Sequence, residues 1–372
     1  MEWLENLNLS VLRYLESLKD EKFEFVYKPI FSSQLEETKN LSLGFSCYAL
    51  KILVLLDQIK YLDTNYIKNW TEFLISFQVK NKIFPLNSFI DNEYIKLFNY
   101  QNPENNLNKS IKKISNTFLK TNYKTNNIKL ENYIRSETKQ SISTLYEVDV
   151  SLNDKFINFP VDEKMLYKYL SNLNWKYPWS SGAQLAAISV FSKTQLQVND
   201  FEINKSILKN FIDNLVDNNS GFYFAQNQKA FMREKINGTM KIITALDWLD
   251  LEVHYPKKLI DSCLKLNPTD EGCDLVDLVY VLFKCNKMTD YKEQEIQEYF
   301  LKLIPIIKTH YKESEGGFSY YANKCQKNYY DVAFTKGKNI ADIHGTLLLV
   351  WAIVMILETL KINYFEYKVI KP

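Results

Sequence analysis

Two polar residues that can carry out acid–base chemistry lie at the start of strongly apolar stretches. His344 follows Asp342 by two positions and precedes Leu347–Leu357, which contains no charged residue. Asp277 lies within Gly272–Phe283, which is also largely apolar. A buried carboxylate must be paired or have a raised pKa, and a histidine in such a place can act as a general base or orient a ligand. We therefore take His344, Asp277 and Asp342 as candidate catalytic residues. The alternative for each is a purely structural, hydrogen-bonded role.

Four basic residues lie at or just before the expected starts of apolar helices: Arg135, Arg233, Lys235 and Lys336. A helix N-terminus has unsatisfied N–H groups and about half a positive charge, so it binds anions readily. Parallel helices would bring several such ends together at one mouth. We expect these four side chains to bind an anionic group there, either a diphosphate or the carboxylate of an acidic sugar. A solvated rim of charges is the alternative.

Aromatic residues near the same helix starts are candidates to line a cavity. Tyr280 and Tyr320 belong to this group, and Trp179 lies in the stiff segment Tyr177-Pro178-Trp179. Aromatic faces hold sugars and stabilise cations, although packing in the core is their commoner role. Gln184 follows in the first turn of the next helix and is expected to face the cavity. These four residues complete the predicted substrate-binding set.

Six apolar helices must position these side chains. Only 9 of the 372 residues are glycines, well under the roughly 7% average, so their positions carry information. Five of the six helices are expected to begin at a glycine and the other at Ser136, which indicates a repeated unit. The expected inner helices are 45–56, 136–148, 182–191, 238–249, 272–283 and 345–357.

Amphipathic segments alternate with these inner helices. They are expected at 4–18, 66–79, 162–173, 202–216, 256–266 and 290–311. Buried helices alternating with amphipathic ones predict an all-α (α/α)6 toroid, in which parallel inner helices surround a central cavity. The chain would form a single domain, 1–372, with an irregular insertion at about 80–131 that contains one helical stretch, Ile111–Leu119. An open α-solenoid is the alternative architecture.

Composition excludes several classes of protein. The net charge of +2 gives no global attraction to nucleic acid. Five cysteines without close pairing indicate a reducing compartment. The N-terminus lacks the pattern of a signal peptide, and Leu347–Leu357 is shorter than the ~20 residues that span a bilayer. We expect a cytoplasmic protein without a transmembrane segment.

Several short motifs resemble the terpenoid cyclase and protein prenyltransferase superfamily. Gly272–Tyr280 is similar to the segment of prenyltransferase β-subunits that supplies an Asp and a Cys zinc ligand. Glu315–Phe318 and Asp342–Thr346 resemble the later Gly-Gly turn and the segment with the third ligand, and Asn218–Phe222 resembles another Gly-Phe turn. The resemblance covers roughly the C-terminal half. It implies the toroid and a substrate such as an isoprenoid or lipid phosphate.

The sequence also departs from these families at the residues that do their chemistry. Val279 stands where the cysteine ligand would be, and His344 is displaced by one position. Zinc needs three or four ligands, so we expect no metal and no cofactor. Neither Asp-x-Asp-Asp nor Asp-Asp-x-x-Asp occurs. The expected function is an enzyme acting on a small anionic or lipid-like substrate in a central cavity. A glycan-active toroid, either a lyase or a hydrolase of acidic sugars, and a non-catalytic ligand-binding toroid are the alternatives.

Overall fold

The chain is mostly helical, as the sequence predicts. The computed structural model describes residues 2–103, 124–225 and 230–372, and the predicted helix Ile111–Leu119 lies outside this part. The α-helices are α1 (Leu7–Leu18), α2 (Leu43–Leu55), α3 (Thr64–Ile75), α4 (Asn92–Gln101), α6 (Asn126–Glu147), α7 (Glu163–Ser171), α8 (Pro178–Gln195), α9 (Val198–Asp213), α10 (Met232–Trp248), α11 (Pro256–Cys263), α12 (Gly272–Asn286), α13 (Glu293–Lys308) and α14 (Ile343–Leu360). The strands are β1 (Tyr311–Lys312), β2 (Gly317–Phe318), β3 (Asn328–Tyr329) and β4 (Val332–Ala333), paired antiparallel as β1–β2 and β3–β4.

The most apolar helix, α14, is a core helix of this fold. Its length and composition would allow it to cross a membrane, but most of its surface is covered by the rest of the chain. The helix begins at Asp342, whose carboxylate accepts a hydrogen bond from the backbone N–H of Gly345. It ends at Lys361, which has a positive φ of 58°. Its burial follows from its sequence, because an apolar surface on all sides must be covered.

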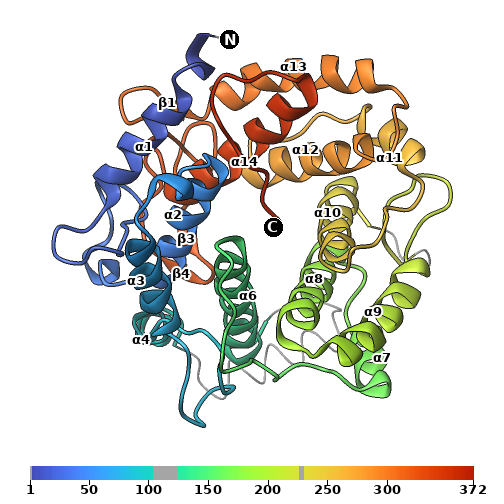
Figure 1. Ribbon diagram of the computed structural model, residues 1–372, viewed down its shortest axis with the longest axis horizontal. Coiled ribbons are helices and arrows are strands. Elements are labelled where there is room, and N and C mark those ends of the chain that lie inside the picture. Colours follow the sequence, from blue (N-terminus) through green and yellow to red (C-terminus); the bar gives the residue numbers. More distant parts are fainter. Residues whose placement is uncertain (1, 104–123, 226–229) are drawn as a thin grey trace.

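Six helices contact one another in sequence order and the contacts return to the first. In the described part of the chain α2 packs on α6, α6 on α8, α8 on α10, α10 on α12, α12 on α14 and α14 on α2. Figure 1 shows these helices around the segment that carries the C-terminal label. Neighbouring helices run in the same direction, because their starts lie together and so do their ends. Arg233 near the start of α10 pairs with Asp274 near the start of α12. Lys193 in the last turn of α8 pairs with Asp250, just beyond the end of α10.

The segments between outer and inner helices repeat a small structural unit. After four of the outer helices the chain makes an antiparallel bridge before it enters the next inner helix. These bridges follow α1, α3, α9 and α13 and pair Lys19 with Tyr27, Gln78 with Phe89, Val216 with Tyr223 and Tyr311 with Phe318. Such recurrence supports the repeated unit that the glycine positions suggested.

A threonine at three inner helices fixes the chain that approaches it. In each case the hydroxyl accepts a hydrogen bond from the backbone N–H of the bridge residue, at 3.0 Å. The donor and acceptor pairs are Phe89 with Thr138 of α6, Tyr223 with Thr239 of α10 and Phe318 with Thr346 of α14. The same contact therefore aligns three of the outer-to-inner connections.

Two helix starts differ from the sequence-based expectation. Gly238 lies inside α10 and Gly182 inside α8, although both were expected at helix starts. The reason is packing. A Cβ on Gly238 would lie 2.7 Å from the Cβ of Pro178, and one on Gly182 would lie 3.2 Å from the carbonyl oxygen of Gly238. Glycine here lets α8 and α10 approach closely.

The expected inner helix at 136–148 is longer than predicted. It begins at Asn126 as α6 and takes in the end of the expected irregular insertion, and α4 forms within that insertion. Polar residues such as Asn and Lys obscured the helical pattern there.

The segment 362–372 crosses the C-terminal ends of the inner helices. The backbone N–H of Lys371 donates to the carboxylate of Glu147 on α6 at 2.8 Å. Its ammonium donates to the carbonyl oxygen of Asp247 on α10 at 2.9 Å. This end of the helix assembly is therefore covered by the chain itself.

Candidate functional site

Asp342 is a structural anchor at the start of α14. Its buried carboxylate accepts hydrogen bonds from the backbone N–H groups of Gly345, Tyr320 and Gln326, at 2.7 to 3.0 Å. Burial raises the pKa of Asp342 to about 6, and these backbone hydrogen bonds oppose the shift. A carboxylate held by three N–H groups has little freedom to exchange protons with a substrate. Its role is to fix the loop that carries Tyr320 and Gln326.

His344, two residues after Asp342, lies between two tyrosine rings. Its ring stacks on Tyr48 of α2, with centroids 4.8 Å apart, and on Tyr320, with centroids 5.4 Å apart. Nδ1 is 3.0 Å from Oε1 of Gln326, so the amide oxygen accepts the Nδ1 proton and Nε2 is left as the basic nitrogen. Burial, aided by the positive charge of Lys241, lowers the pKa of His344 to about 3. The imidazole is therefore neutral at physiological pH.

Asp277 is a fully buried acid with an unused oxygen. It lies on α12, its side chain is 1% exposed, and its Oδ2 has no hydrogen-bond partner among the described residues. Burial raises the pKa of Asp277 to about 7, and Lys241 partly opposes the shift. Near neutral pH the group is thus divided between acid and carboxylate. Such a group can donate or accept a proton.

Three lysines lie on α2, α6 and α10, and the charge of one of them, Lys241, acts on both His344 and Asp277. Lys51 is buried and donates to the hydroxyl of Ser143 at 2.8 Å, while Lys139 and Lys241 are half-buried. No ion pair in the described part of the chain involves any of the three. Burial lowers the pKa of Lys139 well below its usual range, and the charges of Lys51 and Lys241 lower it further. Burial lowers the pKa of Lys51 as well.

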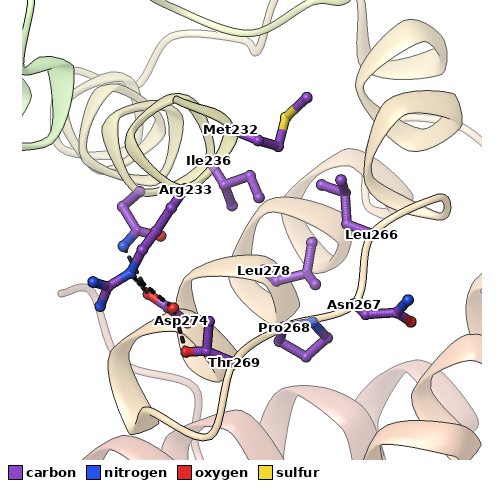
Figure 2. Close-up of a pocket in the computed structure, with 10 residues that line it drawn as sticks. Met232, Arg233, Ile236, Leu266, Asn267, Pro268, Thr269, Asp274 and Leu278 are labelled. Atoms are coloured by element: carbon purple, nitrogen blue, oxygen red, sulfur yellow. Dashed lines mark hydrogen bonds and ion pairs between the residues drawn. The ribbon is translucent and has the colours of Figure 1, made fainter. Parts of the chain in front are cut away.

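Arg233 is neutralised by two carboxylates instead of offering a free charge. Its Nε donates to both oxygens of Asp274 at 2.9 Å, and its Nη2 donates to Glu271. The guanidinium lies over the ring of Trp179, 5.3 Å from its centroid. Figure 2 shows the Arg233–Asp274–Thr269 group on one side of a pocket of about 130 Å³. Neither His344 nor Asp277 lines that pocket.

The other predicted basic residues lie apart from His344. Lys235 sits over the ring of Phe224 at 4.2 Å, and Lys336 is exposed in the loop after β4. Arg135 lies well inside α6 and faces Tyr169 of the outer helix α7. These contacts do not join the four cations at one site, and their common role in binding an anion stays a prediction.

The side chains of Tyr280 and Gln184 also make their hydrogen bonds away from His344. The hydroxyl of Tyr280 donates to Asp247 at 3.0 Å, near the other end of the inner helices, and its ring packs on Trp351 with centroids 5.2 Å apart. Gln184 accepts a hydrogen bond at 2.8 Å from Tyr169, on the outer side of α8. Tyr320, by contrast, lies at the predicted site, where its hydroxyl donates to Glu271 at 2.7 Å.

The structure thus connects some predicted residues and separates others. One linked group contains His344, Tyr320, Asp342, Arg233 and Trp179, joined through Glu271 and the loop at 318–326. The positive charge of Lys241 lowers the pKa of both Asp277 and His344. Lys51, Lys139, Lys241 and Tyr48 were missed by sequence reasoning. The sequence does contain a signal for two of them, because Lys51 and Lys241 are each the single lysine in an otherwise largely apolar stretch.

In the described residues, no group of three or more His, Cys, Asp or Glu side chains is placed to hold a metal ion. The position of the expected cysteine ligand, Val279, is fully buried in the core. The absence of a zinc site in this protein stays a prediction.

Comparisons with known proteins give no assignment: no family model, no curated protein and no solved structure matches this chain.

Proposed function

We propose that the chain is an (α/α)6 toroid with an internal ligand site. Support comes from the circuit of contacts through α2, α6, α8, α10, α12 and α14 and from the outer helices that precede these elements. The return of these contacts from α14 to α2 fits a closed array of outer–inner pairs better than an open solenoid. The segment 362–372 would cover one end, so a ligand would enter at the end that carries His344.

We further propose that the protein is an enzyme acting on a small anionic substrate bound inside this ring. The observation that carries the proposal is the lysine cluster Lys51, Lys139 and Lys241, which no carboxylate neutralises within 4.0 Å in the described part of the chain. Desolvated charges of one sign repel each other, and a phosphate or diphosphate would relieve that repulsion. The substrate class that fits is a phosphate ester of an isoprenoid or lipid.

Asp277 and His344 are the proposed acid–base groups. Asp277 would donate a proton, because its pKa of about 7 keeps much of it protonated at neutral pH and its Oδ2 has no partner among the described residues. His344 would accept a proton or a hydrogen bond at Nε2, since its Nδ1 is directed to Gln326. An enzyme that needs the acid form of Asp277 should lose activity as the pH rises above 7.

Pyrophosphate binding by isothermal titration calorimetry tests the proposal. We expect Lys241→Met to weaken binding by roughly 10- to 100-fold, because one charged hydrogen bond contributes about 1.5–3 kcal/mol. Lys336→Met, at the exposed loop, is the matched control and should bind as the wild type does. Equal binding by wild type and Lys241→Met, or loss only in Lys336→Met, contradicts an internal site.

A second candidate function is the cleavage of acidic glycans by elimination. The observation that favours it is the stack of His344 between Tyr48 and Tyr320, since a neutral histidine next to a tyrosine can remove and return a proton. The lysines would then neutralise the carboxylate of the sugar. A new ultraviolet absorbance from an unsaturated product, lost in His344→Gln, distinguishes this reaction from phosphate-ester chemistry.

A further inference from the structure

A second cavity lies outside the circuit of inner helices, between α6, α8 and the outer helix α7. Its volume is about 420 Å³, within the ~300–1,000 Å³ range of small-molecule sites. The walls are mainly apolar and aromatic. They include Ile134, Phe156, Phe159, Ile188 and Phe191. The three phenylalanine rings pack together. The ring centroid of Phe191 lies 4.9 Å from that of Phe156 and 5.4 Å from that of Phe159.

Arg135 is the cationic group in this cavity. A guanidinium has five N–H donors, and the hydrogen bond that Arg135 makes to a side-chain oxygen, that of Asn132 at 2.5 Å, uses one of them. The phenol of Tyr169 donates its own proton to Gln184, and its oxygen accepts from Arg135 as a second protein partner of the guanidinium. Burial lowers the pKa of Arg135, because it disfavours the charged form of the guanidinium.

No carboxylate among the described residues forms an ion pair with this guanidinium, although the charge of Glu131 favours its protonated form. Glu131, one turn earlier on α6, also lines the cavity, but it is exposed and forms no ion pair with Arg135 within 4.0 Å. In the described part of the chain Arg135 makes no ion pair at all, whereas Arg233 makes two. An apolar cavity with one unneutralised arginine is complementary to a ligand with one anionic group and an apolar body.

We propose that this cavity binds a small amphiphile with a carboxylate head group, with the carboxylate on Arg135 and the hydrocarbon against Phe156, Phe159 and Phe191. The site is separate from the lysine cluster, because it lies between the inner and outer helices and is lined by neither Lys241 nor His344. It can therefore be present or absent independently of the function proposed above.

Octanoate and octanol, titrated calorimetrically into the full chain, test this site. We expect octanoate to bind saturably and octanol to bind at least 10-fold more weakly. Arg135→Gln should weaken octanoate binding by about 10- to 100-fold, because it removes a charged hydrogen-bond donor, and leave octanol unchanged. Arg13→Gln, at an exposed position on α1, is the matched control and should bind octanoate as the wild type does.

Phe159→Ala provides a second variant that acts on the apolar wall. It should weaken both ligands, while circular dichroism and the melting transition establish that each variant is folded. The proposal is overturned if octanoate does not bind, if octanol binds equally well, or if folded Arg135→Gln retains full affinity for octanoate.

Discussion

Buried ionisable groups in this molecule respond to pH in opposite directions. Glu137 is fully buried on α6, and burial raises its pKa to about 8 although the hydroxyl of Tyr329 donates to it. Between the unfolded pKa near 4.5 and this value, the folded state holds a proton that the unfolded state has lost. Stability therefore falls as the pH rises through this range.

Glu137→Gln should remove this dependence. The amide oxygen can still accept from Tyr329, but it does not titrate. Relative to wild type, the variant should gain about 3 kcal/mol in the free energy of unfolding between pH 4.5 and pH 7, since each pKa unit corresponds to 1.36 kcal/mol. Urea denaturation at several pH values measures this, with the exposed Glu131→Gln on the same helix as control. Parallel pH profiles of wild type and Glu137→Gln would contradict the burial account.

His344 should show the opposite behaviour. Its folded pKa of about 3 lies below the unfolded value of 6.5, so the stability it contributes is present above pH 6.5 and is lost as the pH falls toward 3. In an NMR titration its ring resonance, assigned by comparison with His344→Gln, should not move between pH 5 and pH 8. A midpoint between pH 6 and pH 7 would show that the ring is solvated and not held between Tyr48 and Tyr320.

At the residue scale the sequence identified titratable groups in apolar stretches more readily than it identified the lysines, and the acid–base role of those groups stays a prediction. His344 and Asp277 were found because polarity inside an apolar stretch is costly. The same argument applies to Lys51 and Lys241, but basic residues were sought only near helix starts. The neutralisation of Arg233 could not be foreseen, because Glu271 and Asp274 reach it from another helix.

Glycine shapes the contact between α8 and α10 at the scale of the elements. The α8–α10 pair is held at close range by Gly238, where a Cβ would lie 2.7 Å from the Cβ of Pro178 and 2.8 Å from its backbone carbon. Helix propensity favours alanine over glycine by roughly 1 kcal/mol, so any destabilisation by alanine must come from packing.

Gly238→Ala should lower the free energy of unfolding by about 1–3 kcal/mol, the usual cost of overpacking. Gly272→Ala is the matched substitution at the start of α12, where the nearest atom would be 3.2 Å away, and should cost less. Chemical denaturation of both variants measures the difference. Equal or higher stability of Gly238→Ala would mean that the two helices can separate without loss.

The helices were predictable in kind and order but less so in extent. Apolar periodicity located the strongly buried helices α2, α12 and α14 within a few residues. Glycine was taken as the mark of a helix start, and this fails for Gly182 and Gly238 because tertiary packing, not helix termination, requires glycine there. The polar first half of α6 has no apolar pattern that would indicate a helix.

For the whole molecule, the alternation of apolar and amphipathic helices predicted the all-helical class. The path of the segment 362–372 was not predictable. It depends on Glu147 and Asp247, which the sequence gives no reason to place together. The linear sequence also does not reveal that Lys51, Lys139 and Lys241, on three different helices, lie close enough to interact, or that Arg233 is neutralised by two carboxylates. That arrangement is the basis of the proposed function.

A crystal structure of the protein soaked with pyrophosphate tests the central claim most directly, because it locates the anion. The account predicts density for the ligand within hydrogen-bond distance of the ammonium groups of Lys139 and Lys241, close to Asp277. Lys241→Met crystals should lose that density. Pyrophosphate bound only at the rim, against Lys336 or Lys235, or the absence of any bound anion while the lysines keep their positions, would contradict an internal anionic site.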